Sequence, residues 1–142
     1  MFRCVARLAA FAPPRYTAVS EKNSVLFVCD LQEKFRNEIP KFKEICEVTS
    51  RLVKTAHMPI VVTEQYSRGL GHTVEDIQLP PGTPVYEKST FSMCTPPVVE
   101  QLQSPVDSVI LCGIEAHVCC FHTAIALLER GLAVHVVANA VA

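Results

Sequence analysis

Cys119 stands where a cysteine could act as a nucleophile. An apolar run that ends at Cys112 predicts a buried strand, Gly113 interrupts it, and a helical pattern begins close to Cys119. The first turn of a helix carries partial positive charge and unpaired N–H groups, which favour a thiolate. The alternative is a small buried cysteine of the core, and this stretch alone does not decide between the two.

Two other reactive side chains directly follow predicted strands. Asp30 comes after the apolar run 25–29, and Lys88 comes after the short run 85–87. Ligands of open α/β sheets bind beyond the carboxyl ends of the strands, so we expect Asp30, Lys88 and Cys119 to converge in one crevice. Taken singly, Asp30 could cap a helix and Lys88 could be a solvated loop lysine. Together the three side chains predict a catalytic site.

The elements that must position these side chains alternate along the chain. Glycine and proline mark 65–84 as a long loop, of the kind that is often functional. The alternation predicts an α/β domain, a three-layer α-β-α, Rossmann-like parallel sheet. Since a parallel sheet is covered on both faces, we expect a fold truncated at its C-terminus, soon after the last strand. Strands are predicted at 23–29, 59–63, 85–87, 107–112 and 132–138, and helices at 43–56, 98–103 and 119–130.

Composition narrows the class of partner. The 142 residues carry a net charge of −1, which gives no sign of a nucleic-acid partner, and no apolar run is long enough to span a bilayer. The seven cysteines form no CxxC pair, which fits a reducing compartment better than a disulfide framework. We therefore predict a small-molecule substrate, and neither nucleic acid nor membrane as a partner.

The segment 1–20 differs from the rest of the chain. It contains Arg3, Arg7 and Arg15 and no acidic residue, a composition typical of mitochondrial transit peptides. The alternative is a disordered leader on a cytoplasmic protein. We predict a mitochondrial leader followed by one domain at 21–142.

Three separated blocks resemble the isochorismatase-like cysteine hydrolase superfamily, which includes nicotinamidases and N-carbamoyl amidohydrolases. They are Leu-Phe-Val-Cys-Asp-Leu-Gln-Glu-Lys-Phe (26–35), Glu-Lys-Ser-Thr-Phe-Ser (87–92) and Gly-Ile-Glu-Ala-His-Val-Cys-Cys-Phe-His-Thr-Ala (113–124). The resemblance covers about 23–139, and the stretch 62–71 is most similar to animal members of the mitochondrial type. It implies the isochorismatase-like hydrolase fold, which continues past residue 142 with a further helix and strand.

The resemblance implies a triad of Asp30, Lys88 and Cys119. Cys119 would attack a carbonyl or imidate carbon and form a thioester-like intermediate. Asp30 would take the thiol proton and later activate water. Lys88 would lower the pKa of Cys119 and hold Asp30 ionised.

The family also has a cis peptide before the nucleophile, which falls here at Ile114–Glu115. This turn would aim N–H groups at the developing oxyanion, namely those of Glu115 or Ala116 and of Cys119. The family usually has threonine where this chain has Ala116, so one hydroxyl of the turn is absent.

Further residues are predicted to contact the substrate, and the sequence also bears on metal binding. Gln65, Arg68, His72 and Phe91 are predicted to contact the substrate. The Asp-x-His metal motif of nicotinamidases is absent after the second strand, and the Cys/His cluster at 117–122 matches no common zinc spacing. We therefore predict no metal and no cofactor. Because neighbouring subunits often shape the pocket in this family, a homo-oligomer is expected.

The sequence thus predicts a cysteine-dependent hydrolase of a small amide, carbamoyl or related C–N or ester substrate. Two alternatives remain open. The chain could be a binding or scaffold module with little turnover, or a non-productive fragment of a longer protein. Cys120 is predicted to be packed, because adjacent helical residues point about 100° apart.

Overall fold

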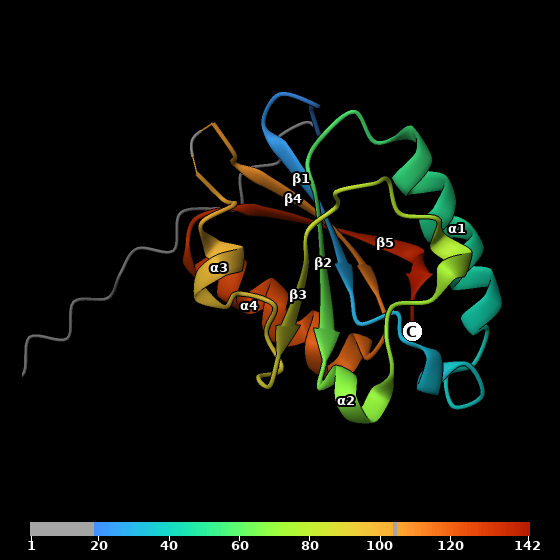
Figure 1. Cartoon of the computed structure of the whole chain (residues 1–142). Coiled ribbons are helices and arrows are strands. Elements are labelled where there is room, and N and C mark those ends of the chain that lie inside the picture. The colour runs from blue at the N-terminus through green and yellow to red at the C-terminus, as the bar shows by residue number, and fades with distance from the viewer. Residues whose placement is uncertain (1–18, 104) are drawn as a thin grey trace, which may run out of the picture.

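The computed structural model describes residues 19–103 and 105–142 and contains a five-stranded parallel sheet in the order β3-β2-β1-β4-β5 (Figure 1). This confirms the predicted α/β class. Apart from Val19 and Ser20, the predicted leader lies outside the described residues. The strands are β1 (Ser24–Cys29), β2 (Ile60–Gln65), β3 (Val85–Lys88), β4 (Ser108–Gly113) and β5 (Ala133–Val141).

The strand register brings the carboxyl ends of the strands to one edge of the sheet. Cys29, the last residue of β1, lies opposite Thr63 of β2 and Gly113 of β4. Lys88, the last residue of β3, lies opposite Gln65 at the end of β2. Residues that follow these strands therefore gather at a single crevice, as expected for a sheet of this kind.

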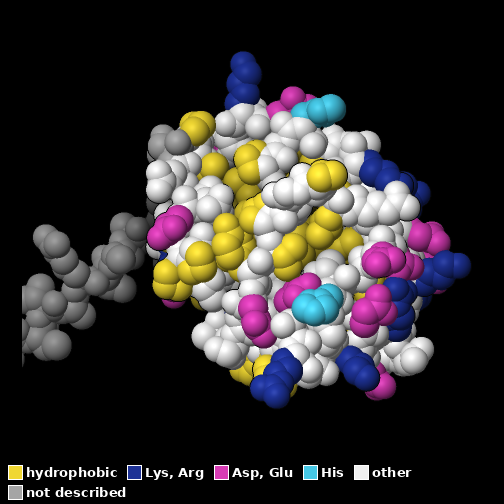
Figure 2. Space-filling model, viewed as in Figure 1, with side chains coloured by type: hydrophobic (Ala, Val, Ile, Leu, Met, Phe, Trp, Pro, Cys, Tyr) yellow, Lys and Arg dark blue, Asp and Glu magenta, His cyan; other side chains and the backbone are white. Residues whose placement is uncertain are grey.

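Helices cover both faces of the sheet (Figure 1). The helix α1 (Phe42–Thr55) lies on one face, and α3 (Pro96–Val99) and α4 (Phe121–Glu129) lie on the other. On the face of the molecule seen in Figure 2, apolar side chains gather near the middle, and Lys and Arg lie scattered among Asp and Glu around them. No helix among the described residues is long and apolar enough to cross a membrane.

The central strand β1 is apolar from Val25 to Cys29, and both of its faces are buried. Leu26 and Val28 of β1 pack under α1, whereas Val25, Phe27 and Cys29 pack on the α4 side. Alternate strand residues point to opposite faces, so each face of the sheet receives its own core.

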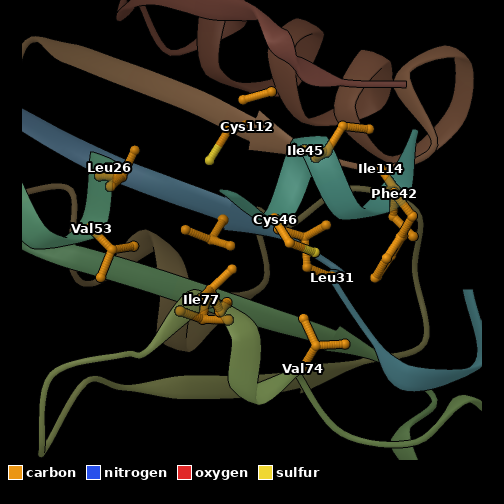
Figure 3. Packing of buried hydrophobic residues seen from close by; sticks show 13 residues of the cluster. Leu26, Leu31, Phe42, Ile45, Cys46, Val53, Val74, Ile77, Cys112 and Ile114 are labelled. Atoms are coloured by element: carbon orange, nitrogen blue, oxygen red, sulfur yellow. The ribbon is translucent and has the colours of Figure 1, made fainter. Parts of the chain in front are cut away.

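The core under α1 is built from helical residues at three- and four-residue spacing (Figure 3). Phe42, Ile45, Cys46 and Val53 pack onto the sheet and are each at most 3% exposed. Burial of a large apolar side chain of this kind stabilises the fold by about 1.5–3 kcal/mol. This packing holds β1, and hence the residue that follows it, in place.

Three predicted elements differ from the structure. The long loop contains the short helix α2 (Ser67–Leu70) and the 3-10 turn η2 (Glu75–Ile77). The helix predicted at 98–103 begins earlier, at Pro96, because proline suits the first turn of a helix, and ends at Val99. The helix predicted from Cys119 is preceded by a π-helical turn, η3 (Ala116–Cys120). A further 3-10 turn, η1 (Glu33–Phe35), follows β1.

Candidate active site

Asp30 lies buried at the end of β1, with both carboxylate oxygens engaged. Thr63 Oγ1 donates a hydrogen bond to Oδ1 at 2.8 Å, and Lys88 Nζ donates to Oδ2 at 2.7 Å. The backbone of Asp30 has φ of 53°, in the left-handed region that non-glycine residues seldom adopt. Such backbone strain concentrates at functional sites, which is consistent with the role predicted for Asp30.

Lys88 is the centre of the site. Its ammonium donates to Gln65 Oε1 at 2.7 Å, to the carbonyl of Thr90 at 3.1 Å and to that of Phe91 at 3.2 Å. It also lies 3.7 Å from Cys119 Sγ, so one buried cation contacts both the carboxylate and the thiol. A buried charge needs such partners, because desolvation without them is costly. The structure therefore brings Asp30, Lys88 and Cys119 together.

Cys119 is held by η3, next to the end of β4. Its carbonyl accepts a hydrogen bond of 2.6 Å from Thr123 Oγ1, which in turn accepts one of 2.9 Å from the Met93 N–H. Cys120 points away from the crevice, and its thiol donates to the Ile114 carbonyl at 3.2 Å. The assignment of Cys119 to the crevice and of Cys120 to the packed interior agrees with this geometry.

The pKa of Cys119 lies above its ordinary value. The hydrogen bond with Cys29 is the main cause, followed by burial and by the negative charge of Asp30. Lys88 acts in the opposite direction but is outweighed. Lys88 thus lowers this pKa as expected, but Cys29 and Asp30, which the neighbouring strands β1 and β4 bring against the thiol, raise it more. Cys119 is a thiol that needs a base.

A cavity of about 340 Å³ opens above these groups. Asp30 and Cys119 form part of its wall, and Gln65 and Phe91 line it as predicted. Phe91 is half exposed and stacks on His122 with ring centroids 5.6 Å apart. The remaining lining residues are Phe35, Leu70, Glu115 and Val118, which the sequence analysis did not single out as substrate contacts, although Glu115 was placed in the turn before the nucleophile.

Arg68 and His72 are not among the residues that line this cavity. Arg68 lies exposed on α2. The ring of His72 is 83% exposed, and its Nδ1 lies 3.0 Å from Glu64 Oε2. Burial alone would raise the pKa of Glu64, but hydrogen bonds from Thr73 and His72 bring it below its usual value. His72 therefore pairs with Glu64 at the loop and does not face Cys119.

Gln32 is a positioning residue that sequence reasoning missed. Its side chain is fully buried; its Oε1 accepts from the Gln65 N–H at 2.7 Å, and its Nε2 donates to the carbonyls of Gln65 and Gly71. These bonds fix the end of β2 and the loop that follows it. The available signal was its place two residues after Asp30, in the first family-like block.

The turn before Cys119 has fewer N–H groups free for an oxyanion than expected. The Ile114 N–H donates to the Cys29 carbonyl at 3.1 Å, and the Ala116 N–H donates to the main-chain oxygen of Ala142 at 2.7 Å. The predicted donors therefore narrow to the N–H groups of Glu115 and Cys119. The cis peptide between Ile114 and Glu115 stays a prediction.

Within the described residues, no group of three or more His, Cys, Asp or Glu side chains could hold a metal ion. The chemistry of the site is therefore considered through its own side chains. A carboxylate, an ammonium and a thiol at the base of one cavity can together move a proton and form a covalent bond to an electrophilic carbon.

Fold and site define a Rossmann-like α/β domain with a buried acid, lysine and cysteine at the ends of its strands. Residues 24–142 match the Isochorismatase domain, and the chain belongs to this family. It is 47% identical over 131 residues to isochorismatase domain-containing protein 2 of Xenopus laevis, covering 89% of this chain and 63% of that protein. It is 44% identical to the Homo sapiens protein of the same description, covering 92% of this chain and 65% of that one.

A solved structure described as the MAR1 ribonuclease from Caenorhabditis elegans is also similar. It is 51% identical, with a TM-score of 0.85, and covers 88% of this chain and 67% of that chain. The present chain thus spans a little under two thirds of the length of the two curated relatives.

Proposed function

We propose that the chain is a cysteine-dependent hydrolase that acts on a small amide, carbamoyl or related C–N or ester substrate. One observation carries the proposal: Lys88 Nζ lies 2.7 Å from Asp30 Oδ2 and 3.7 Å from Cys119 Sγ, beside a cavity that both Asp30 and Cys119 line. Family membership supports the same chemistry.

In the first half of the reaction Cys119 Sγ attacks the carbonyl carbon of the substrate. Because the pKa of this thiol is raised, the proton must leave as the bond forms, and Asp30 is the base at hand. The proton then passes to the leaving amine or alcohol, the C–N or C–O bond breaks, and a thioester joins the acyl group to Cys119. Lys88 stabilises the charge that moves between Asp30 and the sulfur.

In the second half water takes the place of the leaving group. Asp30 accepts a proton from water, the hydroxide attacks the thioester, and the acid product leaves as Cys119 regains its proton. In both halves the oxygen of the tetrahedral intermediate carries negative charge. The N–H groups of Glu115 and Cys119 are the proposed donors to it, since those of Ile114 and Ala116 have other partners.

Ribonuclease activity is the second candidate, because a relative that is 51% identical is described as a ribonuclease. Two observations favour a small substrate instead. The cavity measures about 340 Å³, the size that suits a small molecule. The cations on the face in Figure 2 lie scattered among acids and form no continuous basic surface, which a polyanion would require.

A substrate panel tests the proposal. The purified protein, its Cys119→Ala variant and a Cys112→Ala variant would be assayed against small amides, carbamoyl compounds and esters, with single-stranded RNA as a separate arm. We expect hydrolysis of at least one small substrate that falls by about 10³-fold or more in Cys119→Ala and persists in Cys112→Ala. Cleavage of RNA alone would favour the second candidate, and binding without turnover would favour a scaffold module.

We also propose that residues 1–20 direct the protein to mitochondria and that it works as a homo-oligomer. Fusion of residues 1–20 to a fluorescent protein tests the first proposal; a diffuse cytoplasmic signal would contradict it. Sedimentation of the intact protein tests the second, with a monomer as the contrary result.

A further inference from the structure

The cavity holds one carboxylate that the proposed reaction does not use. Two acidic side chains line it, Asp30 and Glu115. The charge of Asp30 is cancelled by Lys88, which also donates to three other oxygens. With so many acceptors already bound, Lys88 has little capacity left to hold an anionic group of a substrate.

Among the residues that the structure describes, Glu115 has no comparable partner. Its Oε2 lies 3.8 Å from Nε2 of His117, whose side chain is 80% exposed, whereas the side chain of Glu115 itself is 28% exposed. Because the ring of His117 is exposed and 3.8 Å away, it offsets the charge of Glu115 only weakly, and Glu115 keeps its negative charge at the wall of the cavity.

The backbone holds Glu115 firmly at this place. Its φ of 57° lies in the left-handed region, and its carbonyl accepts hydrogen bonds from the N–H groups of Val118 and Cys120 at 2.9 and 3.1 Å. Its carbonyl thus anchors the π-helical turn that carries Cys119. The side chain therefore starts from a defined position four residues before the nucleophile.

The other lining side chains complete the picture. Phe35, Leu70, Phe91 and Val118 are apolar, and Gln65 is neutral. The basic residues Arg68 and His72, which were predicted to contact the substrate, are not part of the lining. The lining of the cavity is thus apolar with a net negative charge.

We propose that Glu115 determines specificity, selecting small substrates with an apolar body that is neutral or cationic and rejecting those that carry a carboxylate or phosphate next to the scissile bond. The part of this proposal that concerns substrates rests on the proposed hydrolase function. The effect of the Glu115 charge applies to any charged reagent that approaches Cys119, so this effect can be tested without turnover.

The test measures how fast Cys119 reacts with two methanethiosulfonates of similar size, one bearing an ammonium group and the other a sulfonate. Peptide mass spectrometry reports the modification of Cys119 alone. The thiolate fraction cancels in the ratio of the two rates, so the ratio reports the local charge. Glu115→Gln should lower the cation-to-anion ratio by about 5- to 20-fold, the range expected for one partly screened charge near the sulfur.

Two variants separate charge from shape. Glu115→Asp keeps the charge and should retain most of the preference, whereas Glu129→Gln removes an exposed carboxylate of α4 and should leave the ratio unchanged. Added salt should reduce the ratio in the unaltered protein and have little effect on Glu115→Gln. A ratio that Glu115→Gln does not change would overturn the proposal.

A second measurement carries the proposal to substrates. Activated esters whose acyl chains end in a methyl, a trimethylammonium or a carboxylate group would be compared by kcat/KM. The carboxylate ester should be the poorest, and Glu115→Gln should narrow the gap by a factor similar to that of the thiol reagents. If no ester is hydrolysed but the reagent ratio falls as expected, the hydrolase proposal fails and the role of Glu115 in charge selection stands. Hydrolysis that favours the carboxylate ester would contradict the specificity proposal alone.

Discussion

The sheet buries cysteines on both of its faces, but their surroundings differ. Under α1, Cys46 and Cys112 sit among apolar side chains, and burial raises the pKa of Cys46 to about 11 and that of Cys112 to about 12. On the α4 side, Cys29, Cys119 and Cys120 share one cluster, and Cys119 also contacts Lys88. The pKa values of Cys29 and Cys119 are raised as well.

The two faces differ in the groups that could accept the proton of a buried thiol. The neighbours of the Cys112 thiol are a hydroxyl, that of Thr49, and the Phe27 carbonyl, which accepts from it at 3.4 Å. Cys119 lies beside a carboxylate and an ammonium at the wall of a cavity. In the proposed mechanism, Cys119 acts as a nucleophile through an adjacent base and access to substrate, and a low pKa is not required in the resting state.

The largest expected effect on stability comes from removing Lys88, the buried cation that contacts Cys119. Lys88→Met leaves the Asp30 carboxylate buried without its partner, which should lower the free energy of unfolding by about 3–5 kcal/mol. Urea unfolding measures this. Lys54→Met, on the exposed side of α1, is the matched control and should change stability by no more than about 0.5 kcal/mol. Equal decreases in the free energy of unfolding in the two variants would show that the buried pair of Asp30 and Lys88 does not contribute specifically to stability.

The next prediction concerns the α1 side at high pH. The pKa of Cys112 is raised by burial, so its contribution to stability is complete below the pKa of the unfolded thiol and is lost as pH rises toward about 12. Near pH 10.5 the loss from this thiol should reach about 2–3 kcal/mol. Urea unfolding between pH 8 and 10.5 should show a shallower decline in Cys112→Ala. The same decline in both proteins would place the alkaline sensitivity elsewhere.

The smallest effect is expected from Cys29, which lies beside Cys119. Its hydrogen bond with Cys119 is the main cause of the raised pKa of that thiol, so Cys29→Ala should shift the pKa of Cys119 downward. The pH profile of alkylation at Cys119 would then move to lower pH, while that of Cys112→Ala would coincide with the unaltered protein. A profile that moves to higher pH in Cys29→Ala would contradict the assignment.

The strand ends of the site were predictable from local sequence. The apolar run before Asp30 predicts a parallel strand buried on both faces, and the short run 85–87 predicts a further strand before Lys88. The carboxyl ends of parallel strands meet at one edge of the sheet. The alternation around Gly113 placed Cys119 near the same edge in the same way. These inferences need only the order of residues within short segments.

Contacts between distant segments were not predictable in this way. The partnership of Cys29 with Cys119 depends on β1 lying beside β4, and alternation alone does not give the order of strands. His72 lies outside the cavity lining because its ring pairs with Glu64. The position of Glu115 at the cavity depends on its left-handed backbone, which the residue type at this position does not predict.

Covalent trapping tests the central claim most directly. The protein would be mixed with an activated small ester, quenched in acid within the turnover time, and mapped by peptide mass spectrometry across all seven cysteines. One acyl adduct is expected, on Cys119, and it should be lost or form much more slowly in Asp30→Asn. An adduct on Cys112 or Cys120, or equal labelling of Cys119 in the presence and absence of the Asp30 carboxylate, would contradict this claim.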